Sequence, residues 1–268
     1  NISSGTEACP RTPVSSEKPH RRMRKRRQTT KEKTDERKSS TMDYKACIFD
    51  LDGTLTDTLE SLTFSVNETM KEIGFPGITQ EQCRQFVGNG AKVLIEKTLL
   101  AGGDETLSRF DEAFAAYGRI FDANCTYRVT PYQGIPELLK ALRERGLRLG
   151  VLSNKPDRQA VHVVETIFGR GVFDTVRGQR DGVPRKPDPA AALAMAEAFG
   201  AAPGETVYIG DSEVDAATGR AAGMETVLVS WGFRPRKVLE KAGEGRAKIV
   251  DSAEEILKMI DERRKVHE

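Results

Sequence analysis

The sequence predicts an α/β fold in which a parallel sheet is interrupted by an all-helical segment. Two observations predict it. From about residue 135 onward, short apolar runs of strand length alternate with stretches of helical periodicity, which is typical of a parallel sheet with helical crossovers. Residues 58–130, by contrast, show helical spacing and no convincing strand. We therefore expect a core formed by residues 43–57 and 131–268, with a helical domain inserted between them.

The first strand is expected at residues 45–49, Lys-Ala-Cys-Ile-Phe, an apolar run of the kind that parallel sheets bury. In the helical segment, two sets of apolar residues follow helical spacing: Leu59, Leu62, Val66, Met70 and Ile73, and then Leu107, Phe110, Phe114 and Phe121. Thr79 and Gln82 match a capping box, and another helix is expected after Gly90. The chain returns to the core at residues 130–134, Thr-Pro-Tyr-Gln-Gly.

The second part of the core is expected to add the remaining strands and their helices. The expected strands lie near 147–152, 172–176, 206–209 and 225–229, with an edge strand near 247–250. The expected helices lie near 135–145, 157–168, 188–199 and 214–222, with a closing helix from about 253. In this arrangement right-handed crossovers join neighbouring parallel strands.

Residues 1–42 are rich in Ser, Thr, Pro, Lys and Arg and hold almost no large apolar residues, so we expect a disordered basic extension. The basic run at 21–27 matches nuclear-localisation or nucleic-acid patterns, while a solvated tail, or sequence upstream of a true start near Met42, is the simpler interpretation. The net charge is +2, but the basic excess lies in this extension and the rest is mildly acidic. An acidic folded part argues against a nucleic-acid-binding fold.

Composition restricts the cellular setting. The chain of 268 residues is 38% hydrophobic and 31% charged, and no apolar run approaches the roughly eighteen residues that span a membrane. No N-terminal signal-peptide core is seen, so no membrane partner is expected. The four cysteines, Cys9, Cys47, Cys83 and Cys125, lack metal-ligand spacing and are too few for a disulfide framework. We expect a cytoplasmic protein, and the sequence predicts no oligomeric state.

Two carboxylates stand directly after the first expected strand, in residues 50–54, Asp-Leu-Asp-Gly-Thr. Side chains two residues apart in extended backbone point the same way, so Asp50 and Asp52 would face one crevice. Open α/β sheets bind ligands in that crevice, at the carboxyl ends of the strands. Such a pair suits phosphoryl chemistry, and a surface Asp-Gly turn is the less favoured alternative when this motif is taken alone.

Three later motifs also fall at expected strand ends or helix starts. Ser153 and Asn154 close the run at 147–152, and Lys186 precedes Pro187 before an expected helix. The run at 206–209 leads into Gly210 and an acidic cluster that contains Asp211 and Asp215. Asp211 could alternatively serve as a helix N-cap.

Taken in order, these four motifs resemble those of the haloacid dehalogenase superfamily of phosphohydrolases, and the resemblance covers about residues 45–250. It implies a Rossmann-like parallel sheet core with an inserted all-helical cap domain at 58–130. It also implies a phosphatase that acts on a small phosphorylated metabolite.

The resemblance assigns roles to the core residues. Asp50 would be the nucleophile that forms an aspartyl-phosphate, and Asp52 would be the general acid and base. Ser153, the main chain of Asn154 and the turn through Gly53 would hold the phosphate. Lys186 would neutralise Asp50 and the phosphate.

Mg²⁺ is the cofactor that the resemblance implies. Asp50, the main-chain carbonyl of Asp52 and Asp211 would be its ligands, and Asp215 would act behind them or through water. Asp57, where the chain leaves the core, is expected to cap the first helix of the insertion.

The loop at 86–92, Phe-Val-Gly-Asn-Gly-Ala-Lys, resembles the cap loop of phosphoglycolate phosphatases, so 2-phosphoglycolate is the first candidate substrate. Gly88 and Gly90 would allow close approach to a small substrate, Asn89 would bind its carboxylate or phosphate, and Lys92 would add positive charge. Two alternatives in the same superfamily stay open: a sugar-phosphate mutase of the β-phosphoglucomutase type and an inorganic pyrophosphatase. A nucleic-acid-associated or partner-binding role of the basic extension is a third.

We predict that the basic extension is dispensable for catalysis, because its composition cannot support a packed structure. A chain shortened to begin at Met42 should keep the kcat/KM and the melting temperature of the full chain. A large loss in either measurement would mean that the extension has a functional role.

Overall fold

A computed structural model describes residues 43–265. Its centre is a six-stranded sheet in the order β5-β4-β1-β6-β7-β8, in which every neighbouring pair is parallel. The strands are β1 (Ala46–Phe49), β4 (Arg148–Pro156), β5 (Thr175–Gln179), β6 (Thr206–Gly210), β7 (Glu225–Val229) and β8 (Lys248–Val250). The predicted α/β class with a parallel sheet is confirmed. The basic extension predicted at 1–42 lies outside the described residues.

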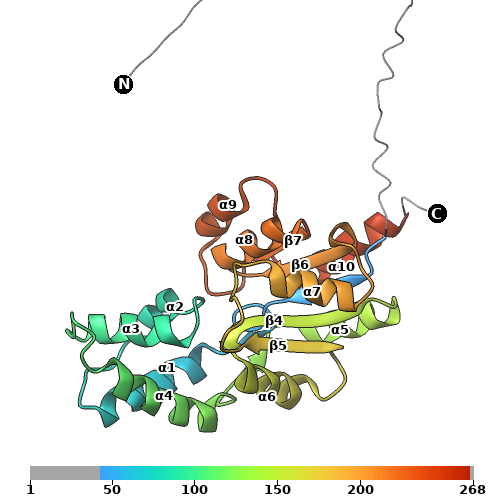
Figure 1. Cartoon of the computed structure of the whole chain (residues 1–268). Helices are drawn as coiled ribbons and strands as arrows, with labels where there is room; N and C mark the ends of the chain where they lie inside the picture. Colours follow the sequence, from blue (N-terminus) through green and yellow to red (C-terminus); the bar gives the residue numbers. More distant parts are fainter. Residues whose placement is uncertain (1–42, 266–268) are drawn as a thin grey trace, which may run out of the picture. The chain divides into compact units, whose positions relative to one another are not determined.

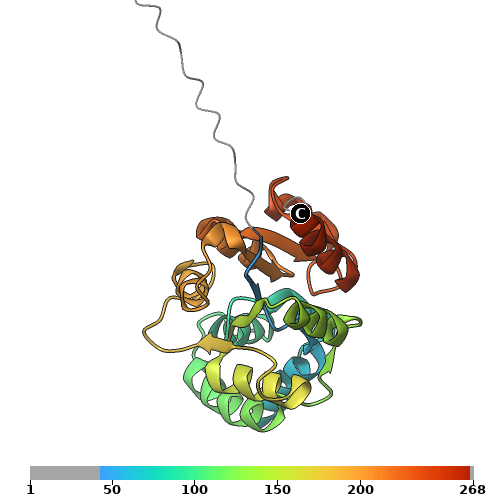
Figure 2. The same ribbon diagram turned by 90° about the vertical axis from the view of Figure 1, so that its right-hand side faces the viewer.

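Helices cover both faces of this sheet, which Figures 1 and 2 show between them. They are α5 (Ile135–Glu144), α6 (Asp157–Phe168), α7 (Ala190–Ala198), α8 (Glu213–Ala222), α9 (Arg236–Gly243) and α10 (Ala253–Lys265), with a 3-10 turn, η1, at Pro203–Glu205. Alternate residues of β1 enter different cores: Cys47 and Phe49 pack with α5, α6 and α10, whereas Ile48 packs with α7. This period of two explains why the strand is apolar throughout.

Four helices lie within residues 58–130 and form a separate group beside the sheet (Figure 1). They are α1 (Leu59–Glu72), α2 (Gln80–Phe86), α3 (Ala91–Ala101) and α4 (Phe110–Asn124). The predicted capping box is present at the start of α2: the Thr79 hydroxyl accepts from the Gln82 N–H, and the Thr79 N–H donates to the Gln82 side chain. Leu107 lies outside α4, with a φ of 53°.

Two short strands, β2 (Thr56–Asp57) and β3 (Thr130–Pro131), pair antiparallel where the chain passes between the sheet and the helical group. The sequence did not predict this ribbon. Nearby, the Trp231 indole N–H donates to the Thr54 carbonyl at 3.1 Å, and the ring lies beside Tyr132. The ribbon and the indole hydrogen bond hold the two segments that connect the sheet with the helical group.

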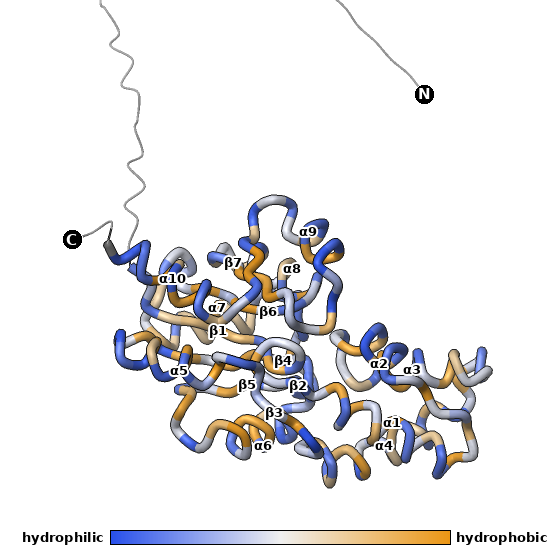
Figure 3. The backbone as a smooth tube through the Cα atoms, turned by 180° about the vertical axis from the view of Figure 1, so that it is seen from behind, coloured by the Kyte–Doolittle hydropathy of each residue, from blue (hydrophilic) through white to orange (hydrophobic). Residues whose placement is uncertain are grey.

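Two predicted strands differ in detail, and one further helix was not predicted. Strand β4 continues to Pro156, beyond the predicted end at 152, and β5 begins at Thr175 rather than 172. Helix α9 was not predicted because it is largely charged and buries little besides Leu239. Figure 3 shows the apolar residues concentrated along strands such as β6 and β7, where the core lies. Within residues 43–265, no helix combines the length and the apolar character needed to cross a membrane.

We predict that the Thr79 capping box stabilises the helical group. Thr79→Ala removes the acceptor for the Gln82 N–H, so the free energy of unfolding should fall by about 1 kcal/mol. Thr79→Ser keeps the hydroxyl and should stay close to the wild type. Denaturant unfolding of both variants measures this, and an alanine variant as stable as the serine variant would contradict it.

Candidate active site

The predicted site residues meet at one end of the sheet because β1 lies between β4 and β6. Asp50 follows β1, Ser153 and Asn154 lie in β4, and Asp211 follows β6. The turn after Asp50 needs glycine: Gly53 has a φ of 87°, and a Cβ there would stand 2.4 Å from an Asp211 carboxylate oxygen. The strand order therefore brings together residues that are far apart in the sequence.

Lys186 connects two of the buried carboxylates. Its ammonium lies 2.8 Å from Asp50 Oδ1 and 2.8 Å from Asp215 Oδ1, and its side chain is only 3% exposed. Burial acts to lower the pKa of Lys186, but Asp215 and Asp50 outweigh it, so the pKa lies well above its ordinary value. Asn154 holds the main chain of Lys186 from both sides, accepting from its N–H and donating to its carbonyl. Lys186 is thus a fixed, protonated cation.

Asp215 supports this arrangement from inside the protein. It is fully buried and accepts from the Ser212 hydroxyl at 2.6 Å and from the Tyr208 hydroxyl at 3.2 Å. Ser212, not Asp211, is the N-cap of α8, so the alternative of Asp211 as the N-cap is wrong: Asp211 lies one residue too early and its carboxylate points elsewhere. One Asp211 oxygen accepts from the Phe233 N–H at 2.7 Å, the other from the Thr54 hydroxyl at 3.3 Å.

The carboxylates of Asp50, Asp211 and Asp215 form one cluster, with oxygen atoms within 4.8 Å of one another. Burial, together with the neighbouring carboxylates, raises the pKa of Asp50 to about 7 even though Lys186 acts to lower it. The same causes raise the pKa of Asp211 well above its ordinary value. Three buried carboxylates with one ammonium leave excess negative charge, and oxygen donors of this kind suit a hard divalent cation. The residues therefore fit a divalent metal.

Asp52 lies apart from this cluster and has its own cation. Its carboxylate is 2.8 Å from the ammonium of Lys155, whose side chain is only 1% exposed. The same ammonium lies 4.7 Å from the centre of the Phe121 ring on α4. Sequence reasoning missed Lys155 because a lysine after a strand-end Ser-Asn pair is usually solvated. The extension of β4 to Pro156 keeps it inside the protein.

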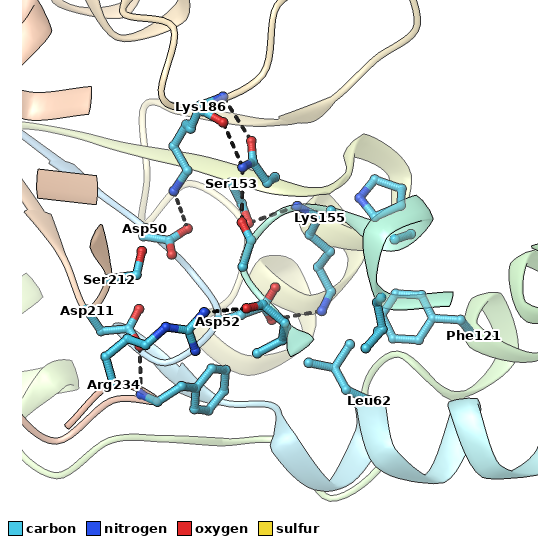
Figure 4. A pocket seen from close by; sticks show the side chains of 18 of the residues that line it. Asp50, Asp52, Leu62, Phe121, Ser153, Lys155, Lys186, Asp211, Ser212 and Arg234 are labelled. Carbon is cyan, nitrogen blue, oxygen red and sulfur yellow. Dashed lines mark hydrogen bonds and ion pairs between the residues drawn. The ribbon is translucent and has the colours of Figure 1, made fainter. Parts of the chain in front are cut away.

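These groups surround a cavity of about 50 Å³ that lies between the sheet and the helical group (Figure 4). Its lining from the sheet side includes Asp50, Asp52, Ser153, Asn154, Lys155, Lys186, Asp211 and Arg234. Its lining from the helical group includes Leu62, Val87, Gly88, Gly90, Leu94, Tyr117 and Phe121. Asp215 lies behind this surface, and neither Gly53 nor Asn89 is among the lining residues.

The loop between α2 and α3 is attached to the core through its main chain. Arg234 donates to the carbonyls of Arg84 and Val87 at 2.8 and 2.6 Å. Asn154 donates to the Gly88 carbonyl at 3.1 Å, and Arg185 to the Asn89 carbonyl at 2.7 Å. The loop thus presents Gly88 and Gly90 to the cavity, while Asn89 contributes a main-chain contact to the core. Sequence reasoning also missed Arg234.

Two other residues that the sequence analysis singled out, Asp57 and Lys92, do not line the cavity. Thr58, not Asp57, is the N-cap of α1, but the Asp57 carboxylate accepts from the Leu59 N–H at 3.1 Å and so has a structural role at the start of this helix. Lys92 is exposed on α3, 5.9 Å from the centre of the Phe114 ring, and is not a lining residue of the cavity.

Comparison with known proteins agrees with this geometry. Residues 47–229 match the family model of haloacid dehalogenase-like hydrolases. A phosphoglycolate phosphatase of Rhodospirillum rubrum is 36% identical over 200 residues, which cover 70% of this chain and 80% of the relative. A structure from Lactobacillus delbrueckii subsp. bulgaricus, with suggested phosphoglycolate phosphatase activity, is 33% identical with a TM-score of 0.72; the match covers 82% of this chain and 99% of the other.

The fold is also shared with a β-phosphoglucomutase from Clostridium difficile, which is 20% identical with a TM-score of 0.67 over 84% of this chain and 98% of the other. At that identity only the fold is comparable. The family model, however, spans more than half of the chain and includes the strand-end carboxylates described above. The chain therefore belongs to the haloacid dehalogenase-like hydrolases.

Proposed function

We propose that the protein is a magnesium-dependent phosphatase that hydrolyses a small phosphate monoester through an aspartyl-phosphate, with 2-phosphoglycolate as the first candidate. One observation carries the proposal: two carboxylates, Asp50 and Asp52, line one small cavity, and each is paired with a buried lysine at 2.8 Å. The phosphoglycolate phosphatase of Rhodospirillum rubrum, similar over most of its length, supports the choice of substrate.

The first half-reaction uses Asp50. Its carboxylate attacks phosphorus, a new O–P bond forms, and the bond from phosphorus to the leaving oxygen breaks. Lys186, fixed beside Asp50, offsets the repulsion between the carboxylate and the phosphate oxygens. Ser153, which lines the cavity, and the Asn154 main chain would hold the phosphate against Asp50.

Asp52 supplies the proton transfers. As a general acid it protonates the leaving alkoxide, and as a general base it later takes a proton from the water that hydrolyses the aspartyl-phosphate. The carboxylate lines the cavity and does not belong to the three-carboxylate cluster. Separation from that cluster leaves it available for proton transfer.

Mg²⁺ would be held by Asp50, Asp211 and the Asp52 main-chain carbonyl, with Asp215 behind them. When bound, it would neutralise the excess charge of this cluster and of the phosphate. The oxygen-only donor set supports magnesium over a softer transition metal.

We also propose that α1–α4, within residues 58–130, act as a cap domain over a core formed by 43–57 and 131–268. Gly88 and Gly90 line the cavity from this side, which supports a role of the cap loop in substrate choice. A cytoplasmic location stays our prediction from the cysteine pattern.

A mutase of the β-phosphoglucomutase type would have the same fold and both aspartates, so these features do not distinguish a mutase from a phosphatase. The similarity to a phosphoglycolate phosphatase over 80% of that relative's length favours a small ester over a sugar phosphate. Inorganic pyrophosphate is also small. A panel of phosphate esters, pyrophosphate and a sugar phosphate, scored by kcat/KM with Mg²⁺ present, tests the three functions directly.

We predict different losses for the two aspartates of the cavity. Asp50→Asn removes the nucleophile, so turnover should fall to background. Asp52→Asn keeps the shape but cannot exchange protons, so kcat should fall by about 10²–10⁴. Steady-state hydrolysis of 2-phosphoglycolate measures both, with exposed Asp188→Asn as control. Full activity of the Asp50→Asn protein would refute the proposed mechanism.

Metal binding should be visible without turnover. Mg²⁺ at about 100 times its Kd should raise the melting temperature by about 5–10 °C, because a ligand of the folded state stabilises it by about 2.7 kcal/mol. Asp211→Asn removes one ligand and should abolish the Mg²⁺-induced rise, while Asp188→Asn keeps it. Thermal unfolding with and without Mg²⁺ gives the answer, and an undiminished rise in Asp211→Asn would exclude Asp211 as a ligand.

A further inference from the structure

The cavity has two chemically different sides. The side near the sheet carries the Asp50–Lys186 pair and Ser153, where the phosphate would bind. The opposite side is formed by apolar side chains of the helical group, among them Leu62, Leu94 and Phe121. Figure 4 shows Asp52 between Asp50 on one side and the Lys155, Phe121 and Leu62 side chains on the other. The remainder of a substrate, beyond its leaving oxygen, would therefore point at this second side.

Lys155 places a single ammonium on this apolar side. Other cations of the lining are more fully engaged: Lys186 holds two carboxylates, and Arg234 holds Glu213 and two carbonyls. The Lys155 ammonium has three N–H donors, and among the described residues its one hydrogen bond goes to Asp52. The Phe121 ring packs against the same ammonium. Donor capacity therefore remains on a cation that is already desolvated.

Tyr117 adds a second polar group to the same side. It is 2% exposed, lines the cavity, and stacks on the Phe121 ring that contacts the Lys155 ammonium. A phenol hydroxyl can donate one hydrogen bond. A phenol on a cavity wall that also carries an ammonium suits an anionic group of a bound molecule.

We propose that Lys155 and Tyr117 bind a carboxylate carried by the leaving group of the substrate. The inference rests on the proposed phosphatase function and names its substrate class: small phosphate monoesters with a carboxylate one carbon from the ester oxygen. In such an ester, a cation that holds both the substrate carboxylate and Asp52 brings Asp52 next to the leaving oxygen. Lys155 then recognises the substrate and positions the group that protonates it.

Two substrates of nearly equal size separate this role from general support of the site. 2-Phosphoglycolate and ethyl phosphate differ in the carboxylate, and the readout is the ratio of their kcat/KM values in the full chain with Mg²⁺. Lys155→Met should lower this ratio about 10- to 100-fold, because a hydrogen bond to a charged group is lost. Tyr117→Phe should lower it about 10-fold, and Lys155→Arg should retain part of it.

Lys92→Met, an exposed lysine of α3, is the matched control and should leave the ratio unchanged. Equal losses on both substrates in Lys155→Met, at an unaltered melting temperature, would overturn the inference and leave Lys155 as a support for Asp52. If Lys155→Met does not fold, the other two variants decide. An unchanged ratio of kcat/KM values in both Tyr117→Phe and Lys155→Arg would also overturn the inference. A wild-type protein that prefers ethyl phosphate refutes this inference alone, whereas one that hydrolyses no ester refutes the proposed function.

Discussion

The bridge from Lys186 to Asp50 and Asp215 is the interaction on which the site depends. Like charges so close together in a dry interior repel strongly, and the ammonium offsets part of that repulsion at 2.8 Å from each partner. Much of the surrounding structure serves this one cation. Asn154 fixes its main chain, while Ser212 and Tyr208 fix the orientation of Asp215. The remaining negative charge is the physical reason why the site suits a divalent metal.

The parallel sheet brings these charged residues together at one edge. Strand β1 lies at the centre, flanked by β4 and β6. The carboxyl ends of these three strands, and the residues that follow them, therefore lie beside one another. Glycine allows the closest approaches: a Cβ at Gly210 would stand 2.2 Å from the Asp215 side chain, and one at Gly232 would stand 2.3 Å from Asp211. Tight packing of this kind holds the carboxylates in place before any ligand arrives.

Sequence reasoning succeeded where a local pattern carries the information. Asp50, Ser153 and Asp211 could be identified because each follows an apolar run, and parallel strands bring such positions together. Sequence reasoning failed for residues whose contact partners lie far away in the sequence. Lys155 lies 103 residues from Asp52, and Arg234 lies 147 residues from the Val87 carbonyl that it holds. The ribbon of β2 and β3 has only two residues in each strand, too few for any periodicity to appear.

The contacts that hold the loop between α2 and α3 in place differ from those that could recognise a substrate. Arg234, Asn154 and Arg185 hold main-chain carbonyls of this loop rather than its side chains. A carbonyl is present whatever residue occupies the position, so these bonds constrain where the loop lies but not which side chains it carries. Chemical selectivity must then come from side chains that enter the cavity. Lys155 comes from the sheet and Phe121 from α4, so the two parts of the chain that enclose the cavity each contribute one partner of the same contact.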